Sequence, residues 1–139
     1  PFLVSAAVSG VIAQRLIRKI CPHCKAETPP PEELIRFNAP ILNTYYKGAG
    51  CDECHNTGYK GRIGVYELLL MDTKLKRMIS KHFTIDDLWN TARESGTKSL
   101  FEDAWLKIAD GTTTVEEVIS KIPYPHYLSE EKLEAKVSV

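Results

Sequence analysis

The sequence lacks a hydrophobic stretch long enough to cross a membrane. No apolar run reaches the roughly 18 residues that a spanning helix needs, and the mostly apolar first 13 residues are interrupted by Ser5, Ser9 and Gly10. This segment also lacks the basic start and the small-residue cleavage site of a signal peptide. We therefore expect no membrane span, and cysteines that stay reduced rather than paired in disulfides.

There is no excess of charge of either sign. The 18 Lys and Arg residues balance 18 Asp and Glu residues, so no global field would attract nucleic acid or an anionic membrane. Hydrophobic residues make up 43% of the 139 residues, which excludes wholesale disorder. This length suits one ordinary domain or two small subdomains.

Motifs for nucleotide hydrolysis and nucleophilic catalysis are also missing. No G-x-x-x-x-G-K-[ST] loop occurs, because no glycine is followed by lysine. Gly58, Gly61 and Gly64 lack the dinucleotide-binding spacing and favour turns and close backbone approach beside a metal. Asp72 follows an apolar run, as Mg²⁺-binding acids do in ATPases, but it is better placed as a helix cap. No Ser/His/Asp set can be identified.

The first 70 residues divide into a periodic segment and an irregular one. Residues 2–20 are predicted to be helical because apolar residues recur at three- and four-residue spacing, at Val4, Val8, Val11, Ile12, Leu16 and Ile20. Residues 21–61 break this period, with a short helix predicted from Pro31 and a short strand over 45–47. A strand over 62–70 is predicted from its β-formers, Ile63, Val65 and Tyr66.

Four helices with recognisable caps are predicted from residue 72 onward. Each begins after a side chain that can accept a hydrogen bond from the first helical turn, namely Asp72, Thr84, Ser99 and Thr114. Gly96 and Gly111 would end the second and third helices, and Pro123 would stop the fourth. The acidic pair Glu116-Glu117 is interpreted as a solvated helix end, and residues 124–139 as a polar tail.

Two C-x-x-C pairs carry the strongest chemical signal. Cys21 and Cys24 form the first pair, and Cys51 and Cys54 form the second, which is the spacing of a four-thiolate zinc site. In each pair a tight turn aims two thiolates at one point, and two pairs complete a tetrahedron. Four cysteine ligands would close the site and leave no position for a catalytic water, so we expect a structural Zn²⁺.

Other uses of these cysteines stay open from the sequence alone. They can be buried free thiols or disulfides, or one pair can be a thioredoxin-like redox motif, although that motif follows a strand and Cys21 is predicted to follow a helix. The segment from Cys51 to His55 also matches the haem attachment pattern C-x-x-C-H. His23 and His55 can compete as metal ligands. The charge of four thiolates can be offset by nearby basic residues, namely Arg18, Lys19, Lys25, Lys60 and Arg62.

The cysteine pairs belong to a longer ordered string of residues. It runs from Ala13-Gln-Arg-Leu-Ile-Arg18 through Cys21-x-x-Cys24 and Gly50-Cys51-x-x-Cys54-x-x-Thr57-Gly-Tyr-Lys-Gly-Arg62 to Gly64-Val-Tyr-Glu-Leu-Leu69. Over about residues 2–122 the chain resembles the C-terminal part of secretion ATPases of the GspE/PilB type, which drive type II secretion and type IV pilus assembly.

This resemblance implies a role for several residues and for the parent protein. The four cysteines match the zinc-binding motif of the family, and Gln14 and Arg15 match a helix near the nucleotide of the parent. The phosphate-binding loop, the Mg²⁺-binding acid and the catalytic glutamate would lie upstream of Pro1, so ATP and Mg²⁺ would be bound by the parent only. That parent would be a homohexameric ATP hydrolase at the cytoplasmic face of the inner membrane, where it would move a membrane platform protein.

The sequence therefore predicts an α+β fold, mainly α, in which a small four-cysteine zinc subdomain with a short antiparallel sheet precedes a C-terminal helical bundle. Because the chain starts with Pro1 inside an apolar segment, we read residues 1–20 as the terminal helix of a truncated ATPase core. The zinc subdomain would cover 21–70, the helical subdomain 71–123 and the tail 124–139. The piece itself would provide structure, subunit contact and partner contact. The alternative is a stand-alone zinc-ribbon module that binds protein or nucleic acid.

Overall fold

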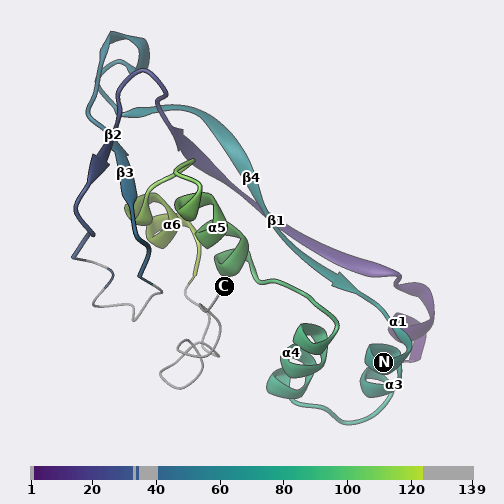
Figure 1. The fold of residues 1–139 in the computed structure, drawn as a ribbon. Coiled ribbons are helices and arrows are strands. Elements are labelled where there is room, and N and C mark those ends of the chain that lie inside the picture. Colours follow the sequence, from purple (N-terminus) through teal and green to yellow (C-terminus); the bar gives the residue numbers. More distant parts are fainter. Residues whose placement is uncertain (1, 33, 35–40, 124–139) are drawn as a thin grey trace.

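The computed structural model describes residues 2–32, 34 and 41–123. Two long strands, β1 (Gly10–Ile20) and β4 (Tyr59–Leu70), form an antiparallel ribbon, and a second ribbon pairs β2 (Lys25–Thr28) with β3 (Tyr45–Gly48). The helices are α1 (Phe2–Ala7), the 3₁₀ helix η1 (Asp52–Cys54), α3 (Thr73–Ile79), α4 (Ile85–Glu94), α5 (Leu100–Ala109) and α6 (Val115–Lys121) (Figure 1).

The prediction of a helix over residues 2–20 is wrong for most of its length. Only α1 is helical there, and β1 pairs with β4 from Gly10 opposite Leu70 to Ile20 opposite Tyr59. The spacing that indicated a helix consists largely of four-residue steps. Four is an even number, so such residues also share one face of a strand. Pairing with a distant partner strand decides between the two structures, and a local pattern does not contain that information.

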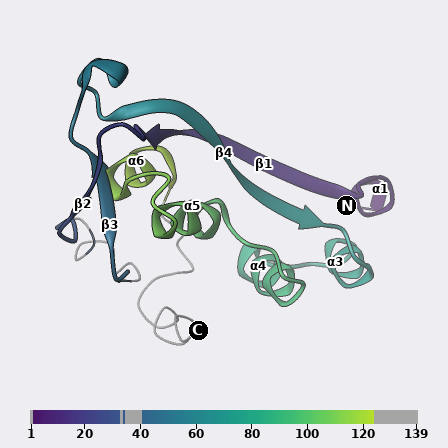
Figure 2. The same cartoon turned by 45° about the horizontal axis from the view of Figure 1, so that its top comes forward.

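One face of the β1–β4 ribbon carries the hydrophobic core. Ile17 and Val65 are fully buried on this face, where α5 and α6 cover the ribbon (Figures 1 and 2). The same core includes residues from the β2–β3 region and from both helices, namely Leu34, Tyr45, Phe101, Ala104, Trp105, Ile108, Val115, Val118 and Ile122. On the opposite face Ile12 and Leu68 are exposed. The cysteine-bearing region and the last two helices therefore share one core.

The α+β class is confirmed, with short antiparallel sheets and five α-helices in the described part of the chain. The strands contribute more than predicted, because β1 and β4 have 11 and 12 residues while the longest described helix has 10. The strand predicted over 62–70 is found as β4 and the one over 45–47 as β3. The short helix predicted from Pro31 falls largely outside the described residues, and the tail 124–139 does so entirely.

The predicted helix caps are present. Asp72 accepts a hydrogen bond from the Leu75 N–H at 2.8 Å. Thr84 and Ser99 each form a capping box, in which the cap residue and the residue three positions later exchange side chain-to-backbone hydrogen bonds. Gly96 and Gly111 follow α4 and α5 with φ of +88° and +70°, a region that suits glycine at a helix end. Thr114 caps α6. The Glu117 carboxylate does not accept a reciprocal hydrogen bond from the Thr114 N–H, because it accepts from Arg18 instead.

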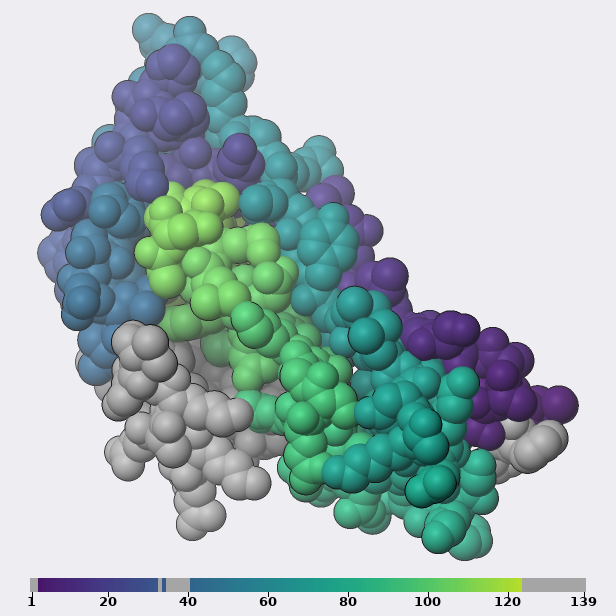
Figure 3. All heavy atoms as spheres, turned by 45° about the vertical axis from the view of Figure 1, so that its right-hand side comes forward, coloured from purple at the N-terminus to yellow at the C-terminus, as the bar shows by residue number. Residues whose placement is uncertain are grey.

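The molecule is elongated along the β1–β4 ribbon. The cysteine-bearing loops lie at one end, and α1 and α3 contact each other at the other end (Figure 3). Among the described residues no helix is long and apolar enough to cross a membrane.

Candidate metal centre

The first cysteine pair lies in the turn between β1 and β2. Cys21 directly follows the last residue of β1, and Cys24 directly precedes the first residue of β2. The Cys24 N–H donates to the Cys21 carbonyl at 3.3 Å, which closes the turn and directs both side chains to the same side. The sequence needs this turn because the chain leaves one ribbon and enters the other within four residues.

The second pair lies in a tighter loop before β4. Cys51 precedes η1, Cys54 ends it, and the N–H groups of Cys54 and Asn56 both donate to the Cys51 carbonyl, at 3.2 and 2.9 Å. His55 and Asn56 adopt left-handed conformations, with φ of +50° and +60°. The chain thus coils around Cys51 and returns to β4 with both thiols facing inward.

Backbone hydrogen bonds join the two loops. The Cys21 N–H donates to the Gly58 carbonyl at 2.9 Å, and the Ala49 N–H donates to the Cys24 carbonyl at 2.9 Å. Glycine is required at this junction, because a Cβ on Gly48 would lie 2.0 Å from the Gly58 carbonyl oxygen. A Cβ on Gly58 would lie 2.6 Å from the Gly48 carbonyl oxygen, so the prediction that glycines permit close backbone approach here is confirmed for Gly58.

The four sulfur atoms converge on one point. The Sγ atoms of Cys21 and Cys51 are 3.8 Å apart, those of Cys24 and Cys54 are 3.8 Å apart, and those of Cys51 and Cys54 are 3.7 Å apart. All four lie within 4.8 Å of one another. A tetrahedral ion with metal–sulfur bonds of about 2.3 Å holds its sulfurs about 3.8 Å apart. The four cysteines are therefore placed to bind a metal ion.

The same distances exclude disulfides in this structure. A bonded sulfur pair would be about 2.05 Å apart, whereas all four cysteines are free thiols. The two histidines beside the cysteines, His23 and His55, are exposed and lie outside the four-residue cluster. Cys21 does follow a strand, contrary to the prediction. A redox or haem pair would nevertheless leave two further thiols pointing into the same site.

The thiols differ in acidity. Burial raises the pKa of Cys24 to about 12 and also raises the pKa of Cys51. Burial opposes ionisation of Cys54 as well. There, however, N–H groups of Cys51 and Gly58 donate to its sulfur, each at 3.3 Å, and the pKa is lowered to about 6. Metal binding must displace the protons that Cys24 and Cys51 hold, so affinity should depend on pH.

Of the basic residues expected to offset the thiolate charge, three have other partners. Lys60 forms an ion pair with Glu53, which raises the pKa of Lys60, and the nearby Cys21 and Cys51 act in the same direction. Lys25 lies over the Tyr46 ring at 4.3 Å. Arg18 turns away from the cysteines toward α6. The charge of Lys60 therefore interacts with Cys21 and Cys51 as well as with Glu53.

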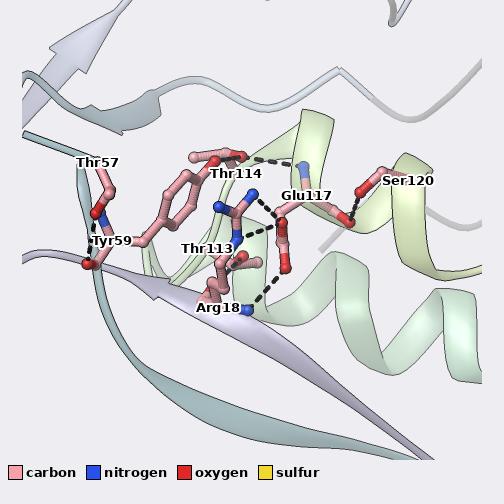
Figure 4. A network of polar contacts seen from close by, with 7 residues as sticks. All are labelled: Arg18, Thr57, Tyr59, Thr113, Thr114, Glu117 and Ser120. Atoms are coloured by element: carbon pink, nitrogen blue, oxygen red, sulfur yellow. Dashed lines mark hydrogen bonds and ion pairs between the residues drawn. The ribbon is translucent and has the colours of Figure 1, made fainter.

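A polar network joins the base of the metal centre to α6 (Figure 4). The Glu117 carboxylate accepts hydrogen bonds from the Arg18 backbone N–H at 3.0 Å, from Nε at 2.9 Å and from Nη2 at 2.6 Å. The Arg18 guanidinium lies 4.0 Å above the Tyr59 ring, and the Tyr59 hydroxyl hydrogen-bonds Thr114 Oγ1 at 2.8 Å. Glu117 is only 2% exposed, so its interpretation as a solvated residue is wrong.

The two residues proposed to lie near a nucleotide are on β1, away from the cysteines. Gln14 donates from its side chain to the Tyr66 hydroxyl at 3.3 Å, and Arg15 donates to the Gln14 carbonyl at 2.9 Å. Both are exposed, and as neighbours in a strand they point to opposite faces. The structure does not bring them together in one site.

Comparison with known proteins confirms the resemblance to GspE/PilB-type secretion ATPases. The family described as type II/IV secretion system protein matches residues 1–120. The type IV pilus assembly ATPase PilB of Thermus thermophilus is 41% identical over 126 residues, which cover 87% of this chain and 14% of that protein. Type II secretion system protein E of Pseudomonas aeruginosa is 38% identical over 122 residues, which cover 86% of this chain and 24% of that protein.

A further relative belongs to the secretion branch. Type II secretion system ATPase E of Vibrio cholerae is 35% identical over 124 residues, 86% of this chain and 24% of its own length. The chain thus spans about a quarter or less of the length of these relatives. With most of its residues matched, the chain belongs to the type II/IV secretion system protein family.

Proposed function

We propose that this chain is the zinc-bearing C-terminal part of a hexameric motor ATPase that powers type II secretion or type IV pilus assembly. The single observation that carries the metal-binding role is the convergence of four cysteine sulfurs at spacings that fit one tetrahedral ion. The names of the relatives, which are pilus assembly and type II secretion ATPases, support the motor role.

Zinc is the ion that this donor set favours. Four thiolates in a tetrahedral arrangement select soft or borderline ions, and structural zinc sites are of this closed kind. Cys21, Cys24, Cys51 and Cys54 would hold it, with no position left for water. When bound, the ion would cross-link the end of β1 to the start of β4, so its contribution would be to folding.

The remaining parts of the proposal concern the whole parent protein. It would hydrolyse ATP as a homohexamer at the cytoplasmic face of the inner membrane and act on a membrane platform protein. The zinc-bearing piece would supply subunit and partner contacts, and Gln14 and Arg15 would lie near the nucleotide of the assembled parent. Both side chains are exposed on β1, which supports their availability for contact with another part of the parent.

Elemental analysis of the purified chain tests the proposal. We expect about one zinc per chain in the wild type and a clear loss of zinc in the Cys51→Ser variant after dialysis against a weak chelator. A Ser5→Ala variant, changed at the far end of the molecule, should retain zinc like the wild type. A wild-type chain that carries no stoichiometric metal, even when it is refolded with zinc, would contradict the proposal.

A further inference from the structure

The end of β1 and the start of β4, which flank the two cysteine pairs, are held by the loop before α6 and by its first turn. We propose that Glu117 is a positioning residue for the metal centre: it sets the separation of the two cysteine pairs, so the affinity for a divalent ion depends on this carboxylate. This inference rests on the proposed metal-binding function. It assigns a role to a residue whose carboxylate accepts hydrogen bonds from Arg18 and does not contact the cysteines directly.

Contacts from the segment Thr112 to Glu117 hold the strand ends, and we call them the clamp. The clamp holds β1 immediately before the first cysteine pair. The Arg18 N–H donates to Glu117 Oε1 at 3.0 Å, and the Arg18 carbonyl accepts from Thr113 Oγ1 at 2.8 Å. Two residues later the Ile20 N–H donates to the Thr112 carbonyl at 2.8 Å. The free edge of β1 is thus fixed by the segment that leads into α6, and Cys21 follows directly.

The same clamp holds the start of β4, immediately after the second cysteine pair. The Arg18 guanidinium, fixed by Glu117, lies over Tyr59, and the Tyr59 hydroxyl bonds Thr114 at the start of α6. Tyr59 follows Gly58, whose N–H donates to Cys54 Sγ and whose carbonyl accepts from Cys21. A shift of Tyr59 would therefore move groups that contact both cysteine pairs.

The strand ladder does not fix this geometry by itself. Its register shifts between Arg18 and Ile20, opposite Arg62 and Tyr59, so the regular pairing is interrupted just before the cysteines. A bulge bends the strand and increases its local twist. Contacts beyond the ladder then help to determine where the two strand ends lie. They are the Cys21–Gly58 backbone bond and the hydrogen bonds from the segment Thr112 to Glu117.

The burial of the ion pair fits a positioning role. The Glu117 side chain is 1% exposed, whereas the Arg18 side chain is 51% exposed. The buried Glu117 carboxylate therefore fixes the position of the partly exposed Arg18 side chain. Relative to apolar residues of similar volume, buried ion pairs add little net stability, because desolvation offsets much of their attraction, although removal of one partner alone is destabilising. Their best-attested use is to specify register, which is what a bulged strand end requires.

Coupling of this kind acts in both directions. If Glu117 raises the metal affinity by organising the strand ends, then a bound ion must stabilise the Glu117 contacts by the same factor. Loss of an outer partner of a metal site costs roughly 10–100-fold in affinity. Glu117 acts through two strands rather than by direct contact, so we expect the lower end of this range, about tenfold.

The test compares Glu117→Gln with Glu116→Gln in the full 139-residue chain, because the neighbouring Glu116 is exposed. Zinc affinity is measured by competition with a chromophoric chelator, and the Co²⁺ spectrum reports the ligand set. We expect about tenfold weaker zinc binding in Glu117→Gln with an unchanged four-thiolate Co²⁺ spectrum, and wild-type affinity in Glu116→Gln. The zinc-induced rise in melting temperature should be smaller in Glu117→Gln than in the control.

A purely structural role predicts a different result. Glu117→Gln would then lower the melting temperatures of the metal-free and zinc-loaded chains equally and leave the zinc affinity unchanged, which would overturn the proposal. Arg18→Ala removes both guanidinium bonds to Glu117 and the contact with the Tyr59 ring, so it serves if Glu117→Gln does not fold. Wild-type zinc affinity in a folded Arg18→Ala chain would also overturn the proposal. Failure of the wild type to bind zinc would instead refute the proposed function.

Discussion

At the scale of the residue, the metal centre depends on small groups that do not themselves bind the ion. Gly58 is the clearest case, because its N–H donates to Cys54 Sγ and its carbonyl accepts from Cys21. It adopts φ +74°, and a Cβ there would lie 2.6 Å from the Gly48 carbonyl oxygen. The cysteines fix the chemistry of the site, whereas this glycine fixes the distance between the two loops that carry it.

Gly58→Ala should therefore destabilise the zinc-loaded chain by more than the cost of the left-handed conformation alone, which is about 1–2 kcal/mol. Gly61→Ala is the matched control, since Gly61 has φ +79° but a Cβ added there would have nothing within 4 Å. Thermal unfolding of both variants measures the difference. Equal destabilisation of the two would show that the contact with Gly48 is unimportant.

Glu117 makes a pH-dependent contribution to stability. Burial alone would raise its pKa, but the hydrogen bonds from the Arg18 side chain and backbone outweigh burial and lower it below the ordinary value. A carboxyl with a lowered folded-state pKa stabilises the fold above its unfolded pKa of about 4.3, and this stabilisation is lost as the pH falls through the folded-state value.

In the metal-free chain, Glu117→Gln should thus be less stable than the wild type by about 1.5–3 kcal/mol at pH 7, the usual range for hydrogen bonds to a charged group. The gap should shrink once the pH falls below about 4.3. Urea unfolding at several pH values measures it, and metal-free protein avoids the separate effect of pH on metal binding. A gap that widened on acidification would contradict the assignment of Glu117 as the ionised partner of Arg18.

At the level of helices and strands, features made by residues close together in the sequence were predicted correctly. Features made by residues far apart were not. The helix caps at Asp72, Thr84 and Ser99 are satisfied within three residues, so the sequence contains the whole interaction. At Thr114 the reciprocal bond of the box fails because Glu117 instead bonds Arg18, 99 residues away. No local pattern marks that partner.

The cysteine cluster and the strand β1 differ in the same way in how far the sequence predicts them. The convergence of four thiols was predictable because the C-x-x-C spacing builds each turn locally and four cysteines suffice for one tetrahedral ion. The strand β1 was not, because its four-residue spacing suits either structure and its partner β4 lies far along the chain. The clamp around Arg18 was missed for both reasons, since it joins a misassigned strand to a distant helix.

Removal of the metal should loosen particular elements rather than the whole molecule. The segments 21–28 and 45–58 include few large buried side chains, so burial alone offsets little of their conformational entropy. Structural zinc sites in small peptides contribute roughly 10–16 kcal/mol of apparent binding free energy at neutral pH. We expect amide hydrogen exchange after chelation to speed up in these segments and, more weakly, at the start of α6.

Helices α3 and α4 provide the internal control for this experiment, because α3 contacts both α1 and α4 at the far end of the ribbon. Their exchange should be nearly unchanged on chelation. Unchanged protection in β2, β3 and the cysteine loops would show that the metal does not hold this region. Equal loss throughout the chain would show instead that the metal supports the whole fold.

At the scale of the whole molecule, one core joins the cysteine-bearing region to the last two helices. Tyr45 from β3 packs in the same cluster as Ile17 from β1 and Ile108 from α5. The metal centre is thus attached to the rest of the molecule in two ways, through this core and through the network around Arg18. A bound ion at the end of the ribbon can therefore influence the packing of α5 and α6.

The purified chain should not hydrolyse ATP, because its sequence has no glycine-rich phosphate loop and no lysine after a glycine. Release of inorganic phosphate from Mg²⁺-ATP is the measurement, with a buffer blank and the Arg15→Ala variant in parallel. Turnover well above the blank that survives further purification would contradict this expectation. Weak nucleotide binding through Arg15 without turnover would agree with it.

Zinc K-edge X-ray absorption of the purified chain is the decisive measurement of whether four cysteines hold one structural zinc ion. We expect four sulfur neighbours at about 2.3 Å and no nitrogen or oxygen in the first coordination shell. Such a spectrum would agree with the sulfur separations of 3.7 and 3.8 Å in the structure. A shell of two sulfurs and two nitrogens would bring His23 and His55 into the site and would refute four-thiolate coordination.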